Sequence, residues 1–592
     1  MTTKITLGNS ILEMRSRDPQ REAVKFKVDD KWVTKSWPEY YQDIETIGSA
    51  LLSMGIKPGD RVAIMANTRY EWSVADYAIF GIKAITVPIY QNNTPEDVEY
   101  ILNNSKARFV ITETRGPLKI FQSVKAQCPS VEKVIVFEDT CPDPEVITWK
   151  TLHEIGKKYR QTNSQAYKEL CETLTPEDTA TLLYTSGTTG RPKGVVLTHL
   201  QAISEVSEAF PLCGATEKDT SLSFLPYAHI LGRIEHWGHA YIGFTMAYAE
   251  SLEKIRGNMI DIRPTFLMSV PRIFEKIYAA IWAQIQTQPL KMKLFEWALS
   301  VGKKVGEYKM SGQALPLDLL LKYEAARKLV LGKISDAFGG RLRFAISGGA
   351  PISKDIALFF HSAGVLILEG YGLTETTAAI TVNTPFNYRF GSVGRPIGEV
   401  KLKIAEDGEI LVKSDKVMKE YYNDPEATKE AFTDGWYHTG DIGELLPGGD
   451  LKITDRKKDL IKTAGGKYVA PQRLEGLLKL CPYITNVLIH GDQKKYIVAL
   501  LTVDRPGLEK LAKEKGVAFK DWPELVKSSF VNEIIRKAVA DANTQLASYE
   551  SIKKFLILPE EFTIEAGELT PSLKVKRKFL DKKFTKEIES LY

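Results

Sequence analysis

The sequence predicts an α/β protein in which helices cover parallel sheets, and two observations lead to that prediction. Strand and helix signals alternate along residues 21–115, as they do when each strand returns to a parallel sheet through a helix. Farther along, glycine-rich corners follow two apolar strands, at Gly348–Pro351 and Gly370–Gly372. Because parallel sheets bind ligands at the carboxyl ends of their strands, these corners are expected to frame a binding site.

The N-terminal elements follow from β-branched runs, helical spacing and turn residues. The turn Pro58-Gly59-Asp60 precedes a buried strand, and Thr94 followed by Pro95 is typical of a helix start. The expected elements are strands over 22–28, 61–65, 84–88 and 109–111, and helices over 37–52 (closed by Gly55), over 72–80 and from 95 onward.

The rest of the chain changes character at a charged cluster, Asp455–Asp459. We therefore predict a large N-terminal domain, 1–454, and a small C-terminal α/β domain, 455–592. The expected segments are strands at 181–183, 195–197, 223–229, 343–347, 365–369 and 460–462, a basic amphipathic helical insertion at about 279–338, and antiparallel strands within 400–455.

Composition is that of an ordinary globular protein, with 44% hydrophobic and 26% charged residues. A net charge of +5 is too small to indicate nucleic-acid binding, but it is compatible with an anionic ligand or membrane surface. The five cysteines are scattered and have no metal-ligand spacing, which favours reduced thiols in a cytoplasmic protein. The start, Met1–Lys4, lacks an apolar signal core, and no run is long enough to span a bilayer, so any membrane contact is expected to be peripheral, on the inner face.

The most informative stretch is the loop Tyr184–Gly194 between two short strands. Its glycines let backbone N–H groups approach a polyphosphate, four hydroxyl side chains add donors, and Lys193 adds a positive charge. It is not a Walker-type loop, because counting from Gly187 puts Pro192 where that motif requires its second glycine. A glycine-rich surface turn without a ligand is the alternative interpretation.

This loop is one of five motifs that lie in separate parts of the chain. They are Tyr184–Gly194, Gly348–Pro351, Tyr371–Glu375, Tyr437–Asp441, and Asp455–Asp459 with the glycines that follow it. In this order, and over nearly the whole chain, they resemble the adenylate-forming superfamily, which includes acyl-CoA synthetases, firefly luciferase and the adenylation domains of peptide synthetases.

Within that superfamily the chain looks most like the long-chain fatty acid–CoA ligases. Asp261–Ile277 matches a segment of that branch, the helical insertion at 279–338 is typical of it, and Glu568–Lys578 resembles its catalytic-lysine loop. Most members have glycine immediately before this lysine, where the present chain has Leu573.

The resemblance implies the adenylate-forming (acyl-CoA synthetase-like) α/β fold. A large N-terminal domain of stacked α/β sheets would carry a small antiparallel β-structure, and a small C-terminal domain would be mobile. The implied reaction joins a long-chain fatty acid to AMP from ATP, with release of pyrophosphate, and then transfers the acyl group to CoA. The first step needs a cation, because two unit charges about 4 Å apart repel by about 4 kcal/mol at an effective dielectric constant near 20.

The resemblance also implies roles for individual residues. Lys574 would lie between the fatty acid carboxylate and the α-phosphate, Glu375 and Thr185 would hold Mg²⁺, Thr374 would reach the α-phosphate, and His229 would belong to the lid of the acyl pocket. In the second step Lys574 would rotate away. The implied contacts to ATP and CoA are Thr185, Ser186, Gly187, Thr188, Thr189, Gly190 and Lys193 at the β- and γ-phosphates, Gly349, Ala350, Pro351, Glu369, Gly370, Tyr371 and Gly372 around the adenine, Asp441 and Arg456 at the ribose, Lys458 at the hinge, and Gly465 and Gly466 at the pantetheine tunnel.

Several alternatives stay open at this stage. The acyl acceptor is CoA or a carrier protein, and a non-catalytic homologue that binds nucleotide or acyl groups is the third hypothesis. His229 has a structural alternative, and because Arg233 and Trp237 follow it, the tryptophan gate of some long-chain enzymes is not carried over. The insertion either lies in a membrane interface or packs as an ordinary amphipathic hairpin. No motif bears on acyl chain length or oligomeric state.

Overall fold

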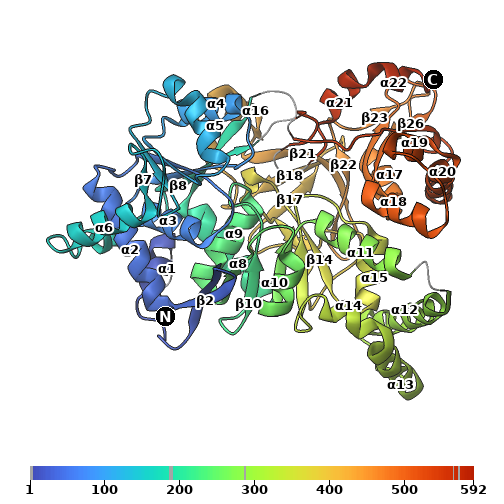
Figure 1. Cartoon of the computed structure of the whole chain (residues 1–592), viewed down its shortest axis with the longest axis horizontal. Coiled ribbons are helices and arrows are strands. Elements are labelled where there is room, and N and C mark those ends of the chain that lie inside the picture. Colours follow the sequence, from blue (N-terminus) through green and yellow to red (C-terminus); the bar gives the residue numbers. More distant parts are fainter. Residues whose placement is uncertain (1–4, 186–190, 286–288, 565, 571–573) are drawn as a thin grey trace.

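The computed structural model describes residues 5–185, 191–285, 289–564, 566–570 and 574–592. Figure 1 shows a large body of sheets and helices, which contains the N-terminus, and a smaller unit at the upper right, which contains the C-terminus. The α/β prediction is confirmed.

The largest sheet has eight strands and includes β8 and β9, which flank the predicted loop Tyr184–Gly194. Its order is β19-β9-β8-β4-β3-β5-β6-β7, in which neighbours from β8 to β7 run parallel, whereas β9 is antiparallel to both β8 and β19. The strands are β3 (Arg61–Met65), β4 (Ile85–Ile89), β5 (Phe109–Thr112), β6 (Lys133–Val136), β7 (Ile147–Thr148), β8 (Thr179–Thr185), β9 (Lys193–Thr198) and β19 (Glu420–Tyr421).

Helices cover both faces of this sheet. Val62 and Ile64 enter one hydrophobic core with α2 and α3, and Ala63 and Met65 enter another with α4 and α5, as the alternation of side chains along a strand requires. The helices of this region are α1 (Leu7–Met14), α2 (Trp37–Ser53), α3 (Tyr70–Gly81), α4 (Pro95–Ser105), α5 (Pro117–Val124), η1 (Lys125–Gln127), α6 (Trp149–Arg160) and α7 (Ala166–Glu172).

The predicted helix boundaries in this region are confirmed at two positions. Gly55, just beyond α2, has a φ of 93°. The Thr94 side chain caps α4 by accepting a hydrogen bond from the backbone N–H of Asp97 at 3.3 Å, with Pro95 in the first turn.

Two further sheets lie beside the first. The order of one is β10-β11-β1-β2, and that of the other is β12-β13-β14-β15-β16. In the second sheet β12, β13 and β14 run parallel, so two strand ends with glycine-rich corners lie next to each other. Their elements are β1 (Glu22–Val28), β2 (Lys31–Ser36), β10 (Thr220–Ser223), β11 (Thr245–Tyr248), β12 (Phe266–Ser269), β13 (Phe344–Ser347), β14 (Ile367–Tyr371), β15 (Thr381–Val382), β16 (Arg395–Pro396), α8 (His199–Leu212), α9 (Ile230–Ile242), α10 (Ile255–Ile262), α15 (Lys354–Ser362) and η3 (Thr374–Thr376).

The strand predicted over 223–229 is wrong beyond its first residue, because β10 ends at Ser223. Pro226 has no N–H to continue a ladder, and its carbonyl instead accepts a hydrogen bond from the N–H of His229 at 2.9 Å, which closes a turn. His229 then occupies the N-cap position of α9.

The antiparallel strands predicted within 400–455 are confirmed. The strands β17, β18, β21 and β20 form one sheet, and β22 pairs with β21. The elements are β17 (Lys401–Ile404), β18 (Glu409–Lys413), α16 (Pro425–Glu430), β20 (Phe432–Thr433), β21 (Trp436–Leu445) and β22 (Leu451–Arg456).

The insertion is helical, as predicted, and helix begins earlier than expected, at Pro271. Figure 1 shows α12 and α13 extending from the body at the lower right. The helices are α11 (Pro271–Ile285), α12 (Pro289–Met310), α13 (Leu317–Ala326), the π-helical turn η2 (Arg327–Leu331) and α14 (Gly332–Asp336).

The C-terminal part has hydrophobic cores of its own, which begin at Ile461. Its three-stranded sheet, β25-β26-β27, is accompanied by the two-stranded hairpin β23-β24. No helix among the described residues is long and apolar enough to cross a membrane. The elements are β23 (Ile461–Lys462), β24 (Tyr468–Val469), α17 (Pro471–Leu478), β25 (Ile484–His490), β26 (Ile497–Val503), α18 (Arg505–Glu514), α19 (Trp522–Lys527), α20 (Ser529–Asn543), β27 (Ile552–Ile557), α21 (Arg577–Lys583) and α22 (Thr585–Glu589).

Candidate active site

The carboxyl ends of β13 and β14 open the site with two glycine-containing corners. Gly349, two residues beyond β13, has a φ of 79°, which favours glycine over any other residue. At the end of β14, a Cβ on Gly372 would lie 1.3 Å from the carbonyl oxygen of Ala378, so no other residue fits there. The corner that includes Ala350 and Pro351 is exposed, which leaves one face of it free for a ligand.

Glu375 lies in the short helical turn η3, just after the Gly372 corner. Its Oε1 accepts a hydrogen bond from the hydroxyl of Tyr421 at 2.8 Å, and its carbonyl accepts one from the N–H of Met418 at 2.7 Å. Burial raises the pKa of the Glu375 carboxyl. Thr374 belongs to the same turn, so the two predicted residues share one small rigid element.

The backbone that follows Glu375 is strained. Thr377 and Ala378 have φ values of 54° and 77°, in the left-handed region that non-glycine residues seldom adopt. The Thr377 hydroxyl donates a hydrogen bond to the carbonyl of Lys416 at 2.7 Å, which helps to hold this conformation.

The predicted pairing of the two strands that flank the loop Tyr184–Gly194 is confirmed. Thr185 and Lys193 are paired across β8 and β9, and the Thr185 hydroxyl lies 3.5 Å from the Lys193 carbonyl oxygen. The Lys193 ammonium lies 4.9 Å from the centre of the Tyr421 ring, the same residue that contacts Glu375. The remaining predicted loop residues, Ser186, Gly187, Thr188, Thr189 and Gly190, lie outside the described residues.

Asp441 and Arg456 face each other across β21 and β22, where their Cα atoms are direct partners. Arg456 Nε lies 3.6 Å from Asp441 Oδ1, and the Tyr371 hydroxyl donates a hydrogen bond to Asp441 Oδ2 at 2.7 Å. Burial raises the pKa of Asp441, and the charge of Arg456 opposes that rise. Each carboxylate oxygen therefore already has one partner, and its remaining lone pairs can accept from ligand hydroxyls.

Lys574 comes from the C-terminal domain and enters the site of the large domain. Burial, and next the positive charge of Arg456, lower the pKa of its ammonium to about 8, while Asp441 and Glu375 act in the opposite direction. Its backbone is held by hydrogen bonds with Thr570 at both the N–H, at 3.0 Å, and the carbonyl, at 2.8 Å. Four predicted residues from distant parts of the chain are thus close enough to influence one another electrostatically.

His229 caps α9 and faces the same space. Its Nδ1 accepts a hydrogen bond from the N–H of Leu231 at 3.2 Å. Burial, with a smaller effect of Lys574, lowers its pKa to about 3, so the imidazole is neutral at physiological pH. With Nδ1 as acceptor, Nε2 carries the proton and is available to donate toward the Gly349 corner, where a Cβ would lie 3.6 Å from His229 Cε1.

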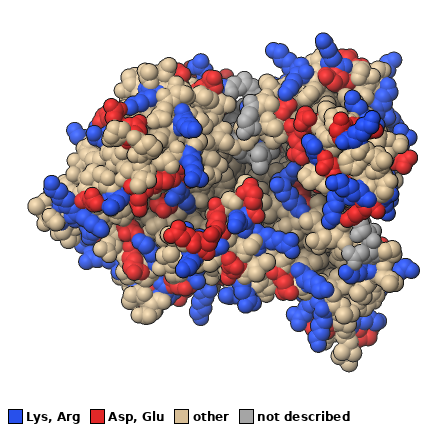
Figure 2. All heavy atoms as spheres, viewed as in Figure 1, with Lys and Arg blue, Asp and Glu red and all other residues tan. Residues whose placement is uncertain are grey.

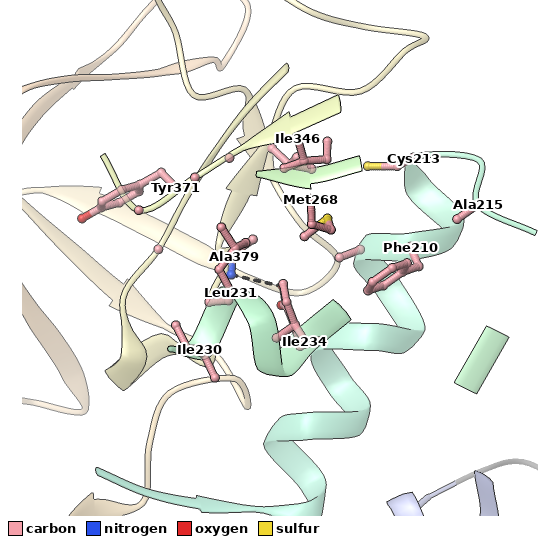
Figure 3. A pocket seen from close by; sticks show the side chains of 18 of the residues that line it. Phe210, Cys213, Ala215, Ile230, Leu231, Ile234, Met268, Ile346, Tyr371 and Ala379 are labelled. Carbon is pink, nitrogen blue, oxygen red and sulfur yellow. Dashed lines mark hydrogen bonds between the residues drawn. The ribbon is translucent and has the colours of Figure 1, made fainter. Parts of the chain in front are cut away.

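A pocket leads from this corner into the large domain. It encloses about 690 Å³ of space that protein atoms do not occupy, part of it open to solvent. Figure 3 shows apolar side chains from α8, α9, β12 and β13 around it. The lining includes Phe210, Cys213, Ala215, Ile230, Leu231, Ile234, Phe266, Met268, Phe344, Ile346 and Ala379, with His229, Gly349 and Tyr371 at the end nearest the polar groups.

Glu369, predicted near the adenine, is almost fully buried in β14. Burial raises its pKa to about 8, and its Oε1 accepts a hydrogen bond of 3.4 Å from the N–H of Ile352. Gly370 is paired with Val382 of β15, so this part of the strand edge is covered on one side.

Three predicted residues are not brought to this cluster. Lys458 is exposed, and Gly465 and Gly466 form the exposed turn of the hairpin β23-β24, where a Cβ on either glycine would contact nothing within 4 Å. The structure thus places Lys574, and not the glycine turn, next to the polar groups.

Three residues that shape the site were not predicted from the sequence. Tyr421 meets Glu375 only because β19 pairs with β9, and Glu205 meets Lys416 across 2.9 Å although 211 positions separate them. Glu205 Oε1 also accepts a hydrogen bond from the N–H of Ala379, which Figure 3 marks with a dashed line. The one local signal was that Glu205 is the acidic residue among the buried side chains of α8.

The residues fit a magnesium ion only when it is shared with a ligand. No group of three or more His, Cys, Asp or Glu side chains among the described residues can hold a metal by itself. Mg²⁺ commonly takes one or two carboxylates together with substrate phosphates, and Glu375, with its second oxygen free of the Tyr421 bond, could supply one of these.

Comparison with known proteins agrees with the geometry. Residues 13–422 match the family described as AMP-binding enzyme, and residues 458–592 match the AMP-binding enzyme C-terminal domain. A long-chain-fatty-acid–CoA ligase, FadD15, of Mycobacterium bovis is 34% identical over 98% of this chain and 96% of its own length. Long chain acyl-CoA synthetase 7, peroxisomal, of Arabidopsis thaliana is 33% identical over 95% of this chain and 81% of its own.

Solved structures show the same fold. The adenylation domain of a carboxylate reductase from Mycobacterium chelonae superimposes with a TM-score of 0.75 at 24% identity, covering 99% of this chain and 91% of that one. A fatty acyl CoA synthetase of Mycobacterium tuberculosis gives a TM-score of 0.62 at 22% identity, covering 98% and 99%.

Proposed function

The chain belongs to the family of AMP-binding enzymes, and on that premise we propose that it is a long-chain fatty acid–CoA ligase. It activates a long-chain fatty acid with ATP to acyl-AMP, releases pyrophosphate, and then transfers the acyl group to CoA with release of AMP. The single observation that carries the proposal is the entry of Lys574 from the C-terminal domain into the cluster of Asp441, Arg456 and Glu375, at the mouth of an apolar pocket.

The acyl chain occupies the apolar pocket, because its lining offers little that can hydrogen-bond. Its carboxylate then lies at the mouth, beside His229 and the Gly349 corner. The neutral His229 donates from Nε2 without adding a further cation to Lys574 and Arg456. Lys574 supplies the positive charge that lets the carboxylate approach the α-phosphate, since an ammonium in a buried site stabilises developing negative charge strongly.

The nucleotide lies across the strand ends of the large domain. The phosphate loop with Thr185 and Lys193 holds the β- and γ-phosphates, and Thr374 donates to the α-phosphate. The adenine lies between the Gly349–Pro351 corner and Tyr371, with Gly370 and Glu369 behind it. Asp441, oriented by Tyr371 and Arg456, accepts from the ribose hydroxyls.

Magnesium, when bound, neutralises phosphate charge and makes pyrophosphate a better leaving group. Glu375 is the protein ligand we propose for it, with the hydroxyl of Thr185. Tyr421 fixes the Glu375 carboxylate by donating to Oε1, so the other oxygen keeps a constant direction.

The second half-reaction requires a rearrangement. We propose that the boundary between the domains lies near residue 455, that Lys458 belongs to the hinge, and that rotation replaces Lys574 by the Gly465-Gly466 turn, which now faces solvent. Glycines at that turn leave room for the pantetheine arm of CoA. We further propose a cytoplasmic location, because all five cysteines are free.

The test measures both half-reactions. Pyrophosphate exchange into ATP should depend on added long-chain fatty acid. An acyl thioester should form with free CoA but not with a phosphopantetheinylated carrier protein. Exchange without thioester formation would point to an acyl-AMP ligase that loads a carrier. Absence of exchange with fatty acids of every length would contradict the proposal.

A further inference from the structure

The helical projection formed by α12, α13, η2 and the first residues of α14, here called the helical hairpin (289–333), has features that the proposed reaction does not use. It lies away from the strand ends that form the site, at the lower right of Figure 1. Among the described residues, eight of the eighteen exposed large apolar side chains belong to it. They are Leu290, Leu294, Trp297, Met310, Leu317, Leu320, Leu321 and Leu329.

These exposed apolar side chains are different from the ones that pack in the interior. Each helix also buries an apolar face, which in α12 includes Phe295, Ala298 and Val305. Leu290, Leu294 and Trp297 recur at intervals of four and three residues, so they form an exposed stripe along the N-terminal half of α12, which borders the buried face and ends at the buried Val301. Leu290 is 85% exposed, Leu294 and Trp297 are 39% and 36% exposed, and Leu317 at the start of α13 is 72% exposed.

The hairpin also carries the net charge of the protein. Between 289 and 333 there are nine basic and four acidic residues, a net charge of +5 that equals the net charge of the whole chain, so the remainder is neutral. Two of the basic residues, Lys322 and Arg327, are paired with acids on α13 at 3.0 and 3.2 Å. Within the described part of the chain, no ion pair is formed by Lys291, Lys293, Lys303, Lys304, Lys328 or Lys333, and all six are exposed.

Charge and apolar surface lie side by side. The period of an α-helix places Lys293 and Lys304 next to the Leu290–Leu294–Trp297 stripe. Figure 2 shows Lys and Arg side chains spread over this projection. An apolar stripe with a tryptophan, bordered by lysines, matches the boundary between headgroups and acyl chains in an anionic bilayer.

We propose that the helical hairpin is a peripheral binding surface for anionic lipid membranes. An acidic protein could pair with the lysines, but it would need a concave apolar surface to bury the projecting leucines. An anionic bilayer can pair with the lysines and bury the leucines as well. Exposure and charge alone support this surface, so it does not depend on the proposed function.

The first test is co-sedimentation of the full chain with vesicles of phosphatidylcholine alone and of phosphatidylcholine with phosphatidylglycerol, at low and high salt. Binding should require the anionic lipid and weaken with salt. The charge-reversal variant Lys291→Glu, Lys293→Glu, Lys303→Glu and Lys304→Glu should lower the partition coefficient by at least about 100-fold at low salt.

A matched control reverses four exposed lysines elsewhere, Lys57, Lys119, Lys150 and Lys218, which have no ion pair among the described residues. It changes net charge by the same amount and should retain binding within about two-fold, because bound lipid would not reach those positions. An equal loss in this control would mean that total charge, and not the hairpin, causes the binding, and the proposal would be overturned.

The apolar stripe is tested separately. The variant Leu290→Ser, Leu294→Ser, Leu317→Ser and Leu321→Ser should also release the protein, while lipids brominated in their acyl chains should quench fluorescence less in Trp297→Phe than in the parent chain. Indifference of binding to lipid charge and salt, or binding that survives both sets of substitutions, would overturn the proposal. Pyrophosphate exchange and melting curves of the same variants separate this outcome from a failure of the reaction or of the fold.

Discussion

Lys416 donates a hydrogen bond of 2.9 Å to Glu205 in the interior, where the two side chains are 2% and 0% exposed. The pair joins α8 to the loop after β18, and both residues also contact the segment that follows Glu375. Glu205 also accepts from the N–H of Ala379, and the Lys416 carbonyl accepts from the Thr377 hydroxyl. We infer that this pair holds the strained backbone after Glu375 and thereby positions the carboxylate.

Removal of either partner should therefore lower the free energy of unfolding. Lys416→Met leaves Glu205 buried and, with Glu208 only 3.0 Å from the same ammonium, creates two neighbouring carboxyls without a cation. Loss of about 3–5 kcal/mol of unfolding free energy is expected, as for other broken buried pairs. Chemical denaturation measures it.

The double variant Glu205→Gln/Lys416→Met should recover part of that loss, because no charge at position 205 is then left unpaired. The side-chain carbonyl of the introduced glutamine still offers an acceptor to the N–H of Ala379. If the double variant were less stable than Lys416→Met alone, the cost would come from packing and not from charge.

Lys574→Ala should reduce pyrophosphate exchange by on the order of 10²–10³, the scale seen when one preorganised charge-stabilising group is removed. Thioester formation from preformed acyl-AMP should be largely spared, because the lysine is proposed to leave the site in that step. Equal losses in both half-reactions would contradict the proposed rotation of the C-terminal domain.

Lys574 also predicts a pH dependence. Its pKa is lowered to about 8, so the ammonium is present below that pH and is lost as the pH rises through it. Since kcat/KM reports the free enzyme, exchange should fall about tenfold per pH unit above roughly pH 8. Neutral His229 does not titrate in this range.

Burial raises the pKa of Glu369 to about 8 as well, so a second variant is needed to assign the effect. Lys574→Arg keeps its charge at every accessible pH, and the alkaline decline should disappear or move upward in the activity it retains. An unchanged decline in this variant would assign the titration to Glu369.

Glu375→Gln should abolish most adenylation while the melting temperature stays close to that of the parent chain. The amide oxygen still accepts from the Tyr421 hydroxyl at the same position, so the local structure is kept and only the charge for the metal is lost. Pyrophosphate exchange measured over a range of Mg²⁺ concentrations tests this loss of adenylation. Full activity at ordinary Mg²⁺ would remove Glu375 from the metal site.

Much of the fold could be predicted because its signals are local. Val62 and Ile64 alternate with Ala63 and Met65, which identifies a strand buried on both faces, and Thr94 with Pro95 marks a helix start through its own hydrogen bonds. Hydrogen-bonding geometry within a few residues determines such features, so they can be recognised without the rest of the molecule. The order of the five motifs, likewise, is a property of the chain itself.

Only the tertiary structure decided which side chains meet. Tyr421 reaches Glu375 because β19 joins the edge of β9, Lys416 reaches Glu205 across 211 positions, and Lys574 enters the site because the C-terminal domain lies against the large one. The extended prediction for 223–229 failed for a local reason instead, since Pro226 has no N–H for a strand ladder and its carbonyl closes the turn that leads to the His229 cap. Long-range pairings depend on burial summed over the whole molecule, and a short stretch of sequence carries no record of that sum.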